Sequence, residues 1–139
     1  MNTILVGVDG SEHGDAALVF AAEEAALRGA SLLVVCAWEP PMMIAPLGVY
    51  TAEAFESLGE NSKNIVRAAV ARVAELQPKV VCEGKAVEGQ PAAEILKAAE
   101  SANMIVVGSR GRGGFASLLL GSVTQQVVHH ARCPVVIVR

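Results

Sequence analysis

Short apolar runs alternate along this chain with longer segments whose apolar residues recur at helical spacing. The runs cover residues 3–8, 31–37, 79–87, 104–107 and 135–138. The helical segments cover 12–28, 51–77, a stretch that opens at 90–91, and 122–131. Strands that alternate with helices specify a parallel sheet whose crossover helices cover both of its faces. We therefore predict one doubly wound α/β domain over residues 1–139, with five parallel strands.

The composition agrees with strands that are buried on both sides. Hydrophobic residues make up 53% of the chain but aromatic residues only 4%, so Val, Ile, Leu and Ala must build the core. Residues 79–87 are more polar and alternate in character, which predicts an edge strand. Periodicity predicts two buried helix faces: Leu18, Ala21, Ala22 and Ala25 in the first, and Phe55, Leu58, Ile65, Ala69, Val73 and Leu76 in the second.

Charge and composition exclude several classes of function. The formal net charge is −3 and the pI about 5.6, so the molecule does not attract nucleic acid electrostatically. No apolar run approaches the length of about 18–20 residues that spans a bilayer. No basic leader or cleavage site is visible at the start, which predicts a cytoplasmic protein. Three cysteines without CxxC spacing, Cys36, Cys82 and Cys133, favour buried thiols over disulfides or zinc.

Two predicted loops carry unusual chemistry, and each follows the carboxyl end of a strand. The first is Asp9-Gly10-Ser11. The second begins with Gly108, Ser109, Arg110, Gly111, Arg112, Gly113 and Gly114, and it continues to Gly121-Ser122. In a doubly wound sheet, ligands bind beyond the carboxyl ends of two strands where the winding reverses. We therefore expect the two loops to meet in one crevice.

The second loop has the features of an anion site. Its glycines permit positive φ and close approach of the backbone, and successive N–H groups in such turns bind anions. Ser122 and Gln125 match a capping box, which predicts that Ser122 caps the last helix. A helix N-terminus there favours phosphate. Arg110 and Arg112 either neutralise phosphate charge or are solvated surface residues.

Asp9 is the acidic group of the predicted crevice. Its carboxylate is suited to bind a ribose hydroxyl, or to help hold a Mg²⁺ ion that bridges phosphates. The alternative is that Asp9 only forms the turn before the first helix, together with Gly10 and Ser11. We favour the ligand role, since Asp9 and the glycine loop independently indicate the same crevice.

The spacing of the glycines indicates a family. Neither G-x-G-x-x-G after the first strand nor a Walker motif is present, but Gly108-x2-Gly111-x9-Gly121-Ser122 is. This pattern resembles the nucleotide motif of ATP-binding universal stress proteins. The resemblance covers essentially the whole chain: residues 4–11 look like the family's first strand and loop, 87–91 like its turn before the third helix, and 133–136 like its closing strand.

This resemblance implies a strand order of 3-2-1-4-5, with ATP held between the first and fourth strands. It implies phosphate and ribose contacts at Gly108, Gly111, Gly121, Ser122 and neighbours that include Ser109 and Val123. The acidic contact maps to Asp9 beside Gly7, and the adenine contact lies around Ala37. It also implies a homodimer through Val135–Val138 and a regulatory or signalling role in the stress response.

Other residues have weaker claims. His129 and His130 end the last helix with no nucleophile placed beside them, so we expect structural roles. His13 is a candidate for phosphate contact, although a surface position on the first helical turn is favoured. Met42 and Met43 lie in a proline-rich apolar loop, and we consider that they cover the nucleotide as a lid, contact a partner subunit, or belong to a mobile loop.

Binding is favoured over catalysis. The second hypothesis is a slow ATPase or a phosphoryl- or nucleotidyl-transfer enzyme, but hydrolysis needs a positioned base, and Asp9 is the one candidate. A purely structural dimer would not need an intact glycine loop. A receiver domain would want an aspartate where Val87 and Glu88 end the third strand, and flavin binding would want a hydroxyl-rich first loop.

Overall fold

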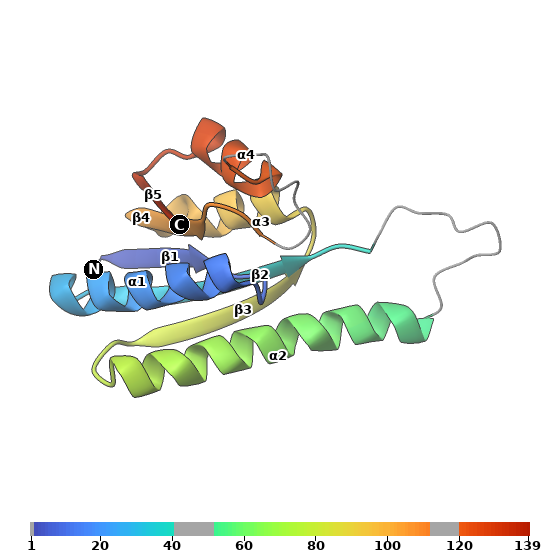
Figure 1. Cartoon of the computed structure of the whole chain (residues 1–139), viewed down its shortest axis with the longest axis horizontal. Coiled ribbons are helices and arrows are strands. Elements are labelled where there is room, and N and C mark those ends of the chain that lie inside the picture. The colour runs from blue at the N-terminus through green and yellow to red at the C-terminus, as the bar shows by residue number, and fades with distance from the viewer. Residues whose placement is uncertain (1, 41–51, 112–119) are drawn as a thin grey trace.

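A parallel five-stranded sheet forms the centre of the molecule, with strands in the order β3-β2-β1-β4-β5 (Figure 1). The computed structural model describes residues 2–40, 52–111 and 120–139. The elements are β1 (Thr3–Gly7), α1 (Glu12–Arg28), β2 (Ser31–Trp38), α2 (Ala52–Leu76), β3 (Cys82–Glu88), α3 (Pro91–Ala98), a 3₁₀ turn η1 (Ala99–Ser101), β4 (Met104–Gly108), α4 (Ser122–His130) and β5 (Val135–Val138). The predicted α/β fold class and strand order are confirmed.

The first strand lies in the middle of the sheet and pairs on both sides. Val6 lies opposite Val34 of β2 on one side and opposite Val106 of β4 on the other. The chain therefore moves from β1 outward to β2 and β3, and then returns across β1 to build β4 and β5. The winding reverses between β1 and β4, which is where a doubly wound sheet opens a crevice.

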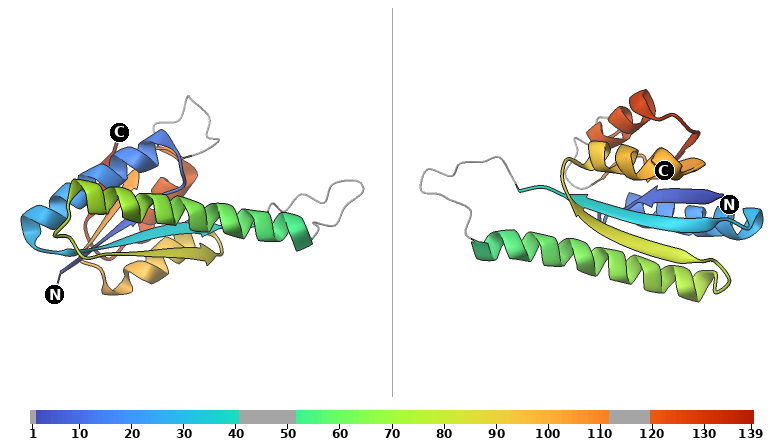
Figure 2. Two further views of the ribbon diagram at one scale, coloured as in Figure 1. Left: turned by 90° about the horizontal axis from the view of Figure 1, so that it is seen from below. Right: turned by 180° about the vertical axis from the view of Figure 1, so that it is seen from behind.

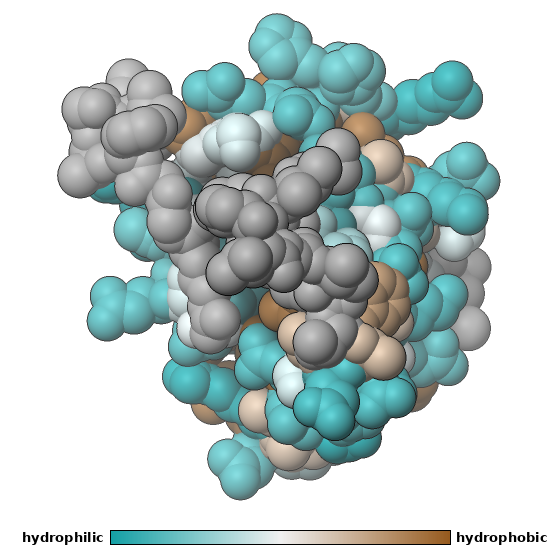
Figure 3. Space-filling view, turned by 90° about the vertical axis from the view of Figure 1, so that its right-hand side faces the viewer, coloured by the Kyte–Doolittle hydropathy of each residue, from teal (hydrophilic) through white to brown (hydrophobic). Residues whose placement is uncertain are grey.

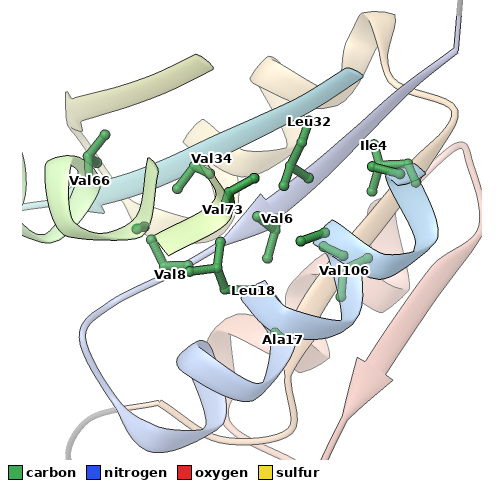
Figure 4. Close-up of a cluster of buried hydrophobic side chains, with 14 of the residues drawn as sticks. Ile4, Val6, Val8, Ala17, Leu18, Leu32, Val34, Val66, Val73 and Val106 are labelled. Carbon is green, nitrogen blue, oxygen red and sulfur yellow. The ribbon is translucent and has the colours of Figure 1, made fainter. Parts of the chain in front are cut away.

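Alternating side chains of each strand face two separate helix layers. Ile4 and Val6 point toward the cluster that α1 and α2 cover, whereas Leu5 points toward the cluster under α3 and α4. Figure 2 shows α1 and α2 on one face of the sheet and α3 and α4 on the other. Figure 4 shows Leu18 and Val73 directed from the helices toward Val6 and Val34. Burial on both faces explains why the strands are nearly continuous in apolar residues.

Local signals in the sequence set the bounds of α1. Ser11 is its N-cap and accepts a hydrogen bond from the Gly14 N–H at 3.1 Å. Gly29 ends it with φ 61°, in the left-handed region that favours glycine. The predicted buried face is confirmed at Leu18 and the three alanines, and Arg28 pairs with Glu24 at 2.8 Å.

The predicted inner face of α2 is partly wrong. The buried positions are Ser62, Val66, Ala69 and Val73, whereas Leu76 in the last turn is 43% exposed. Ser62 is tolerated there because its hydroxyl donates to the Cys36 carbonyl at 3.2 Å. Apolar periodicity could not find this residue, since a satisfied serine interrupts the stripe.

We predict that Leu18→Ala lowers the free energy of unfolding by about 2–4 kcal/mol, because it leaves a cavity among buried neighbours. Leu27→Ala is the matched control, since the same substitution falls on the same helix. Leu18 is 2% exposed and Leu27 is 80% exposed, so the control should change stability by less than about 0.5 kcal/mol. Urea denaturation measures both values, and equal losses would contradict the assigned packing of α1.

Candidate functional site at the carboxyl ends of β1 and β4

A cavity of about 260 Å³ lies where β1 and β4 end. This volume is just under the range of about 300–1,000 Å³ that is usual for small-molecule pockets. The loops after β1 and β4 contribute to it, together with Ala37 of β2 and the N-terminal parts of α1, α3 and α4. Figure 3 looks onto this end of the molecule, where hydrophilic side chains surround smaller apolar patches.

Most of the residues predicted from the sequence come together at this cavity. Nine of them line it: Gly7, Asp9, Ala37, Gly108, Arg110, Gly111, Gly121, Ser122 and Val123. Arg112, Gly113 and Gly114 lie outside the described residues, as do Met42 and Met43. The crevice predicted between the first and fourth strands is therefore present, with residues from both predicted loops in its wall.

Ser109 is not among the lining residues and has a structural position. It is buried, its N–H donates to the Val138 carbonyl at 2.7 Å, and its carbonyl accepts from the Gly121 N–H at 2.8 Å. Ser109 thus connects the end of β4 both to β5 and to the residue before α4. A ligand contact through its side chain has no support in this arrangement.

Sequence reasoning missed the apolar half of the wall. Val8, Pro91, Ile95 and Val107 line the cavity, but in the sequence they read only as strand and helix residues. Ile95 was expected on the inner stripe of its helix, and it does pack in the cluster between α3 and the sheet. Its place in the cavity wall follows from the position of α3 beside β1, which periodicity alone does not give. Gly14 and Thr124 were also missed.

Asp9 forms the turn that starts α1 and also lines the cavity. Its Oδ1 accepts the Ser11 N–H at 3.0 Å and the Ser11 hydroxyl proton. The turn-forming alternative is thus observed in the structure, and it fixes the carboxylate at the cavity wall. A role in holding the turn and a role toward a ligand are compatible here.

The glycines of the second loop permit positive φ, but those that the structure describes do not adopt it. Gly108, Gly111 and Gly121 all lie outside the left-handed region. Gly108 is required for another reason, because a Cβ there would lie 2.8 Å from the His13 carbonyl group. Close packing between the β4 end and the first turn of α1 therefore demands this glycine. His13 lies in that turn, as predicted, and its side chain is half-buried.

The N-terminus of α4 is directed at the cavity, but its cap differs from the predicted capping box. Gly121 is the N-cap, Ser122 is the first helical residue, and no side chain caps the helix. Gln125 Nε2 donates instead to the Leu120 carbonyl at 3.3 Å. The first-turn N–H groups have no acceptor within a helix, and all three first-turn residues line the cavity: Ser122, Val123 and Thr124.

Thr124 fixes this helix end to the sheet. Its side chain is buried, and Oγ1 donates to the Gly108 carbonyl at 2.7 Å. The bond joins the first turn of α4 to the last residue of β4, on opposite sides of the loop. A buried, satisfied hydroxyl at this position sets where the N–H groups of α4 lie.

Burial raises the pKa of Cys82 and of Cys133 above the ordinary thiol value, and neither cysteine lines the cavity. All three cysteines are free thiols. No group of three or more His, Cys, Asp and Glu that could hold a metal occurs in the parts of the chain that the structure describes.

The two histidines of α4 lie at its far end from the cavity-lining turn. His130 Nδ1 lies 2.9 Å from the Gln126 carbonyl, so that nitrogen carries the proton that is donated. The two rings make an edge contact, with centroids 6.5 Å apart.

Among the described helices, none is long and apolar enough to cross a membrane.

The parallel sheet in the order β3-β2-β1-β4-β5, with helices on both faces and a crevice at the point where the winding reverses, defines a doubly wound α/β domain. The Universal stress protein family profile matches residues 1–139, and the chain belongs to that family. A universal stress protein from Thermus aquaticus is 41% identical over 143 residues, covering 99% of this chain and 98% of its own length. One from Mycolicibacterium smegmatis is 35% identical over 136 residues, covering 98% of this chain but 45% of its own length.

The chain therefore spans about half the length of several curated relatives that it matches. Solved structures show the same fold. The universal stress protein UspA from Lactobacillus plantarum has a TM-score of 0.84 at 24% identity, covering 99% of this chain and 97% of its own. A universal stress protein from Archaeoglobus fulgidus in complex with dAMP has a TM-score of 0.73 at 26% identity, covering 100% of this chain and 98% of its own. A further universal stress protein, in complex with cAMP, has a TM-score of 0.75 at 27% identity, covering 99% of this chain and 96% of its own.

We predict that Thr124→Val lowers the free energy of unfolding by about 1–3 kcal/mol, because it leaves the buried Gly108 carbonyl without its donor. Ser122→Ala provides the comparison within the same helical turn. A capping serine would cost about 1 kcal/mol when replaced, but Ser122 makes no cap bond, so this variant should stay within about 0.5 kcal/mol of the wild type. Chemical denaturation decides, and a larger loss for Ser122→Ala would restore the capping box.

Proposed function

We propose that this protein binds ATP, or a closely related adenine nucleotide, in the cavity between β1 and β4. The observation that carries the proposal is the wall itself, where glycines and the first turn of α4 meet an apolar segment. Helix N-termini and exposed backbone N–H groups bind phosphate, and an apolar wall suits a purine ring. The dAMP and cAMP complexes of structurally similar universal stress proteins support the choice of an adenine nucleotide.

The two ends of the cavity suit different parts of the ligand. Gly111, Gly121, Ser122 and Val123 would hold the phosphates, with Arg110 adding positive charge at the wall. Gly108 and the undescribed Arg112, Gly113 and Gly114 belong to the same proposed loop contact. The Ser122 hydroxyl is not engaged in capping, which leaves it available to donate to a phosphate oxygen.

The base would lie at the apolar end. Ala37, the last residue but one of β2, lines the cavity there, and Val8, Pro91 and Ile95 line the adjoining wall. A Cβ at Gly7 would lie 2.9 Å from Ile95 Cδ1, so a side chain there would displace the end of the Ile95 side chain from this wall. We assign Asp9, beside that end, to a ribose hydroxyl or to Mg²⁺ bound together with the phosphates.

A regulatory protein that binds nucleotide fits this wall better than an efficient enzyme. Asp9 is the only carboxylate among the described lining residues, and its Oδ1 already accepts two bonds from Ser11. Phosphoryl transfer needs a group that orients water or takes a proton. We therefore propose a cytoplasmic signalling role in which the bound nucleotide sets the state of the protein, and slow turnover is the alternative.

A second copy of this chain is the proposed protein partner. β5 is an edge strand, paired on one side with β4. All four of its residues are half-exposed, although they are Val, Val, Ile and Val. An apolar edge strand is a template for pairing with another strand, so we propose that β5 forms the homodimer contact.

Released nucleotide tests the binding proposal. We expect protein purified natively and then denatured to release ATP, or to bind added ATP with Mg²⁺ if it is purified empty. Gly111→Ala/Gly121→Ala should lose this, because added methyl groups crowd the wall, and Leu27→Ala, remote and exposed, should keep it. Chromatography identifies the nucleotide, and wild-type protein that neither carries nor binds ATP would overturn the proposal. ATP hydrolysis well above a slow background, lost in Asp9→Ala, would instead favour the enzyme.

Sedimentation tests the dimer. We expect a mass of about twice 14.4 kDa at micromolar concentration. Ile137→Lys should shift the protein toward the monomer, because a lysine on an edge strand opposes strand pairing. Circular dichroism confirms that the variant is folded, and a wild type that sediments as a monomer would rule out the β5 contact.

A further inference from the structure

The Asp9 carboxylate is flanked by two glycines from different elements. A Cβ built at Gly111 would lie 2.5 Å from Asp9 Oδ2, and a Cβ built at Gly14 would lie 2.9 Å from Asp9 Oδ1. Real Cβ atoms essentially never come closer than 3.0 Å to such a neighbour. We call the space between Gly14 and Gly111 the carboxylate slot. The slot exists only while both positions lack a side chain.

Asp9 cannot turn away from the slot at little cost. Its Oδ1 accepts the Ser11 N–H at 3.0 Å and the Ser11 hydroxyl, and Ser11 in turn caps α1 through the Gly14 N–H. Rotation of the carboxylate would break bonds that hold the start of α1. A methyl group at position 111 therefore forces a choice between a clash and a disrupted turn.

We infer that Gly111 is a positioning residue that acts through Asp9: it is glycine in order to hold the Asp9 carboxylate at the cavity wall. This inference rests on the proposed nucleotide site, whose acidic group it explains. It joins the second glycine of the G-x2-G-x9-G-S pattern to the acidic residue of the other loop. Those two loops are otherwise separated by about a hundred residues of chain.

Backbone conformation does not explain this glycine. Gly111 lies outside the left-handed region, so a side chain is not excluded by φ. Gly121 is a useful contrast in the same wall, because a Cβ there would come no closer than 3.4 Å, to Arg110 Cα, and its three nearest atoms do not include the Asp9 carboxylate. The two glycines therefore differ in what a methyl group would displace.

A double-mutant cycle tests the inference through nucleotide affinity. We expect Gly111→Ala to weaken ATP binding about tenfold in the wild-type background. In the Asp9→Ala background, where the slot is empty, the same substitution should change affinity by less than about twofold. Calorimetric titration with Mg²⁺ present, extended to millimolar ATP for the weaker variants, measures all four proteins. Equal factors in the two backgrounds would overturn the inference.

Two controls separate shape from charge and from general damage. Asp9→Asn keeps a group of the same size in the slot, so Gly111→Ala should remain costly there, whereas a charge effect would disappear. Gly121→Ala should weaken binding by the same factor with or without Asp9→Ala, because its methyl group does not contact the carboxylate. Coupling between Gly121 and Asp9 as large as that of Gly111 would contradict a specific slot.

A second measurement needs no ligand and separates this inference from the proposed function. The ¹³C resonance of the Asp9 carboxyl carbon, assigned by its loss in Asp9→Ala, should move in Gly111→Ala and stay in place in Gly121→Ala. If the wild type binds no nucleotide but the resonance moves as expected, the proposed function fails and the slot stands. If the resonance is unmoved in Gly111→Ala, the slot is wrong whether or not ATP binds.

Discussion

The pairing of β1 with both β2 and β4 is the constraint on which the rest of this structure depends. Because Val6 lies between Val34 and Val106, the chain must reverse its winding across β1, and the loops after β1 and β4 must diverge to opposite faces of the sheet. The cavity is the space that this divergence leaves. Buried valine and leucine make the reversal possible, since a central parallel strand needs helices on both faces. The polar chemistry of the site is thus placed by an apolar strand.

Contacts between the two loops then decide what the cavity offers. Gly108 lets the His13 backbone approach the end of β4, and Thr124 ties the first turn of α4 to that same residue. Ser109 joins the loop to β5 through the Val138 carbonyl. These contacts are buried, and together they hold the first turn of α4 in the wall of the cavity that the Asp9 carboxylate also lines. An anion bound there would meet N–H groups whose position was fixed before it arrived.

The fold could be predicted from the sequence because the spacing of apolar residues within each segment, and the residues at its ends, are local features of the chain. The predicted segment 12–28 matches α1, which Ser11 caps and Gly29 ends, and the polar alternation of residues 79–87 indicated the edge position of β3. The prediction failed where burial depends on a partner distant in sequence. Ser62 is inside because of the Cys36 carbonyl, and Ile95 reaches the cavity because α3 lies beside Gly7. No local pattern contains either contact. The predicted cap at Ser122 was wrong, since Gly121 is the N-cap of α4 and Ser122 is already its first helical residue.

A motif identifies residues more reliably than it identifies what they do. The pattern of Gly108, Gly111, Gly121 and Ser122 indicated a loop whose glycines permit positive φ and close approach to a ligand, and the described ones adopt φ values open to any residue. Gly108 is constrained by the backbone of α1 and Gly111 by the Asp9 carboxylate, while Gly121 begins a helix. Two of the three glycines of the spacing therefore meet separate packing requirements in one crevice, and the third is the N-cap of a helix. A chain that kept the spacing but lost Asp9 or Thr124 would still match the pattern, although the geometry that the pattern stands for would no longer be held in place.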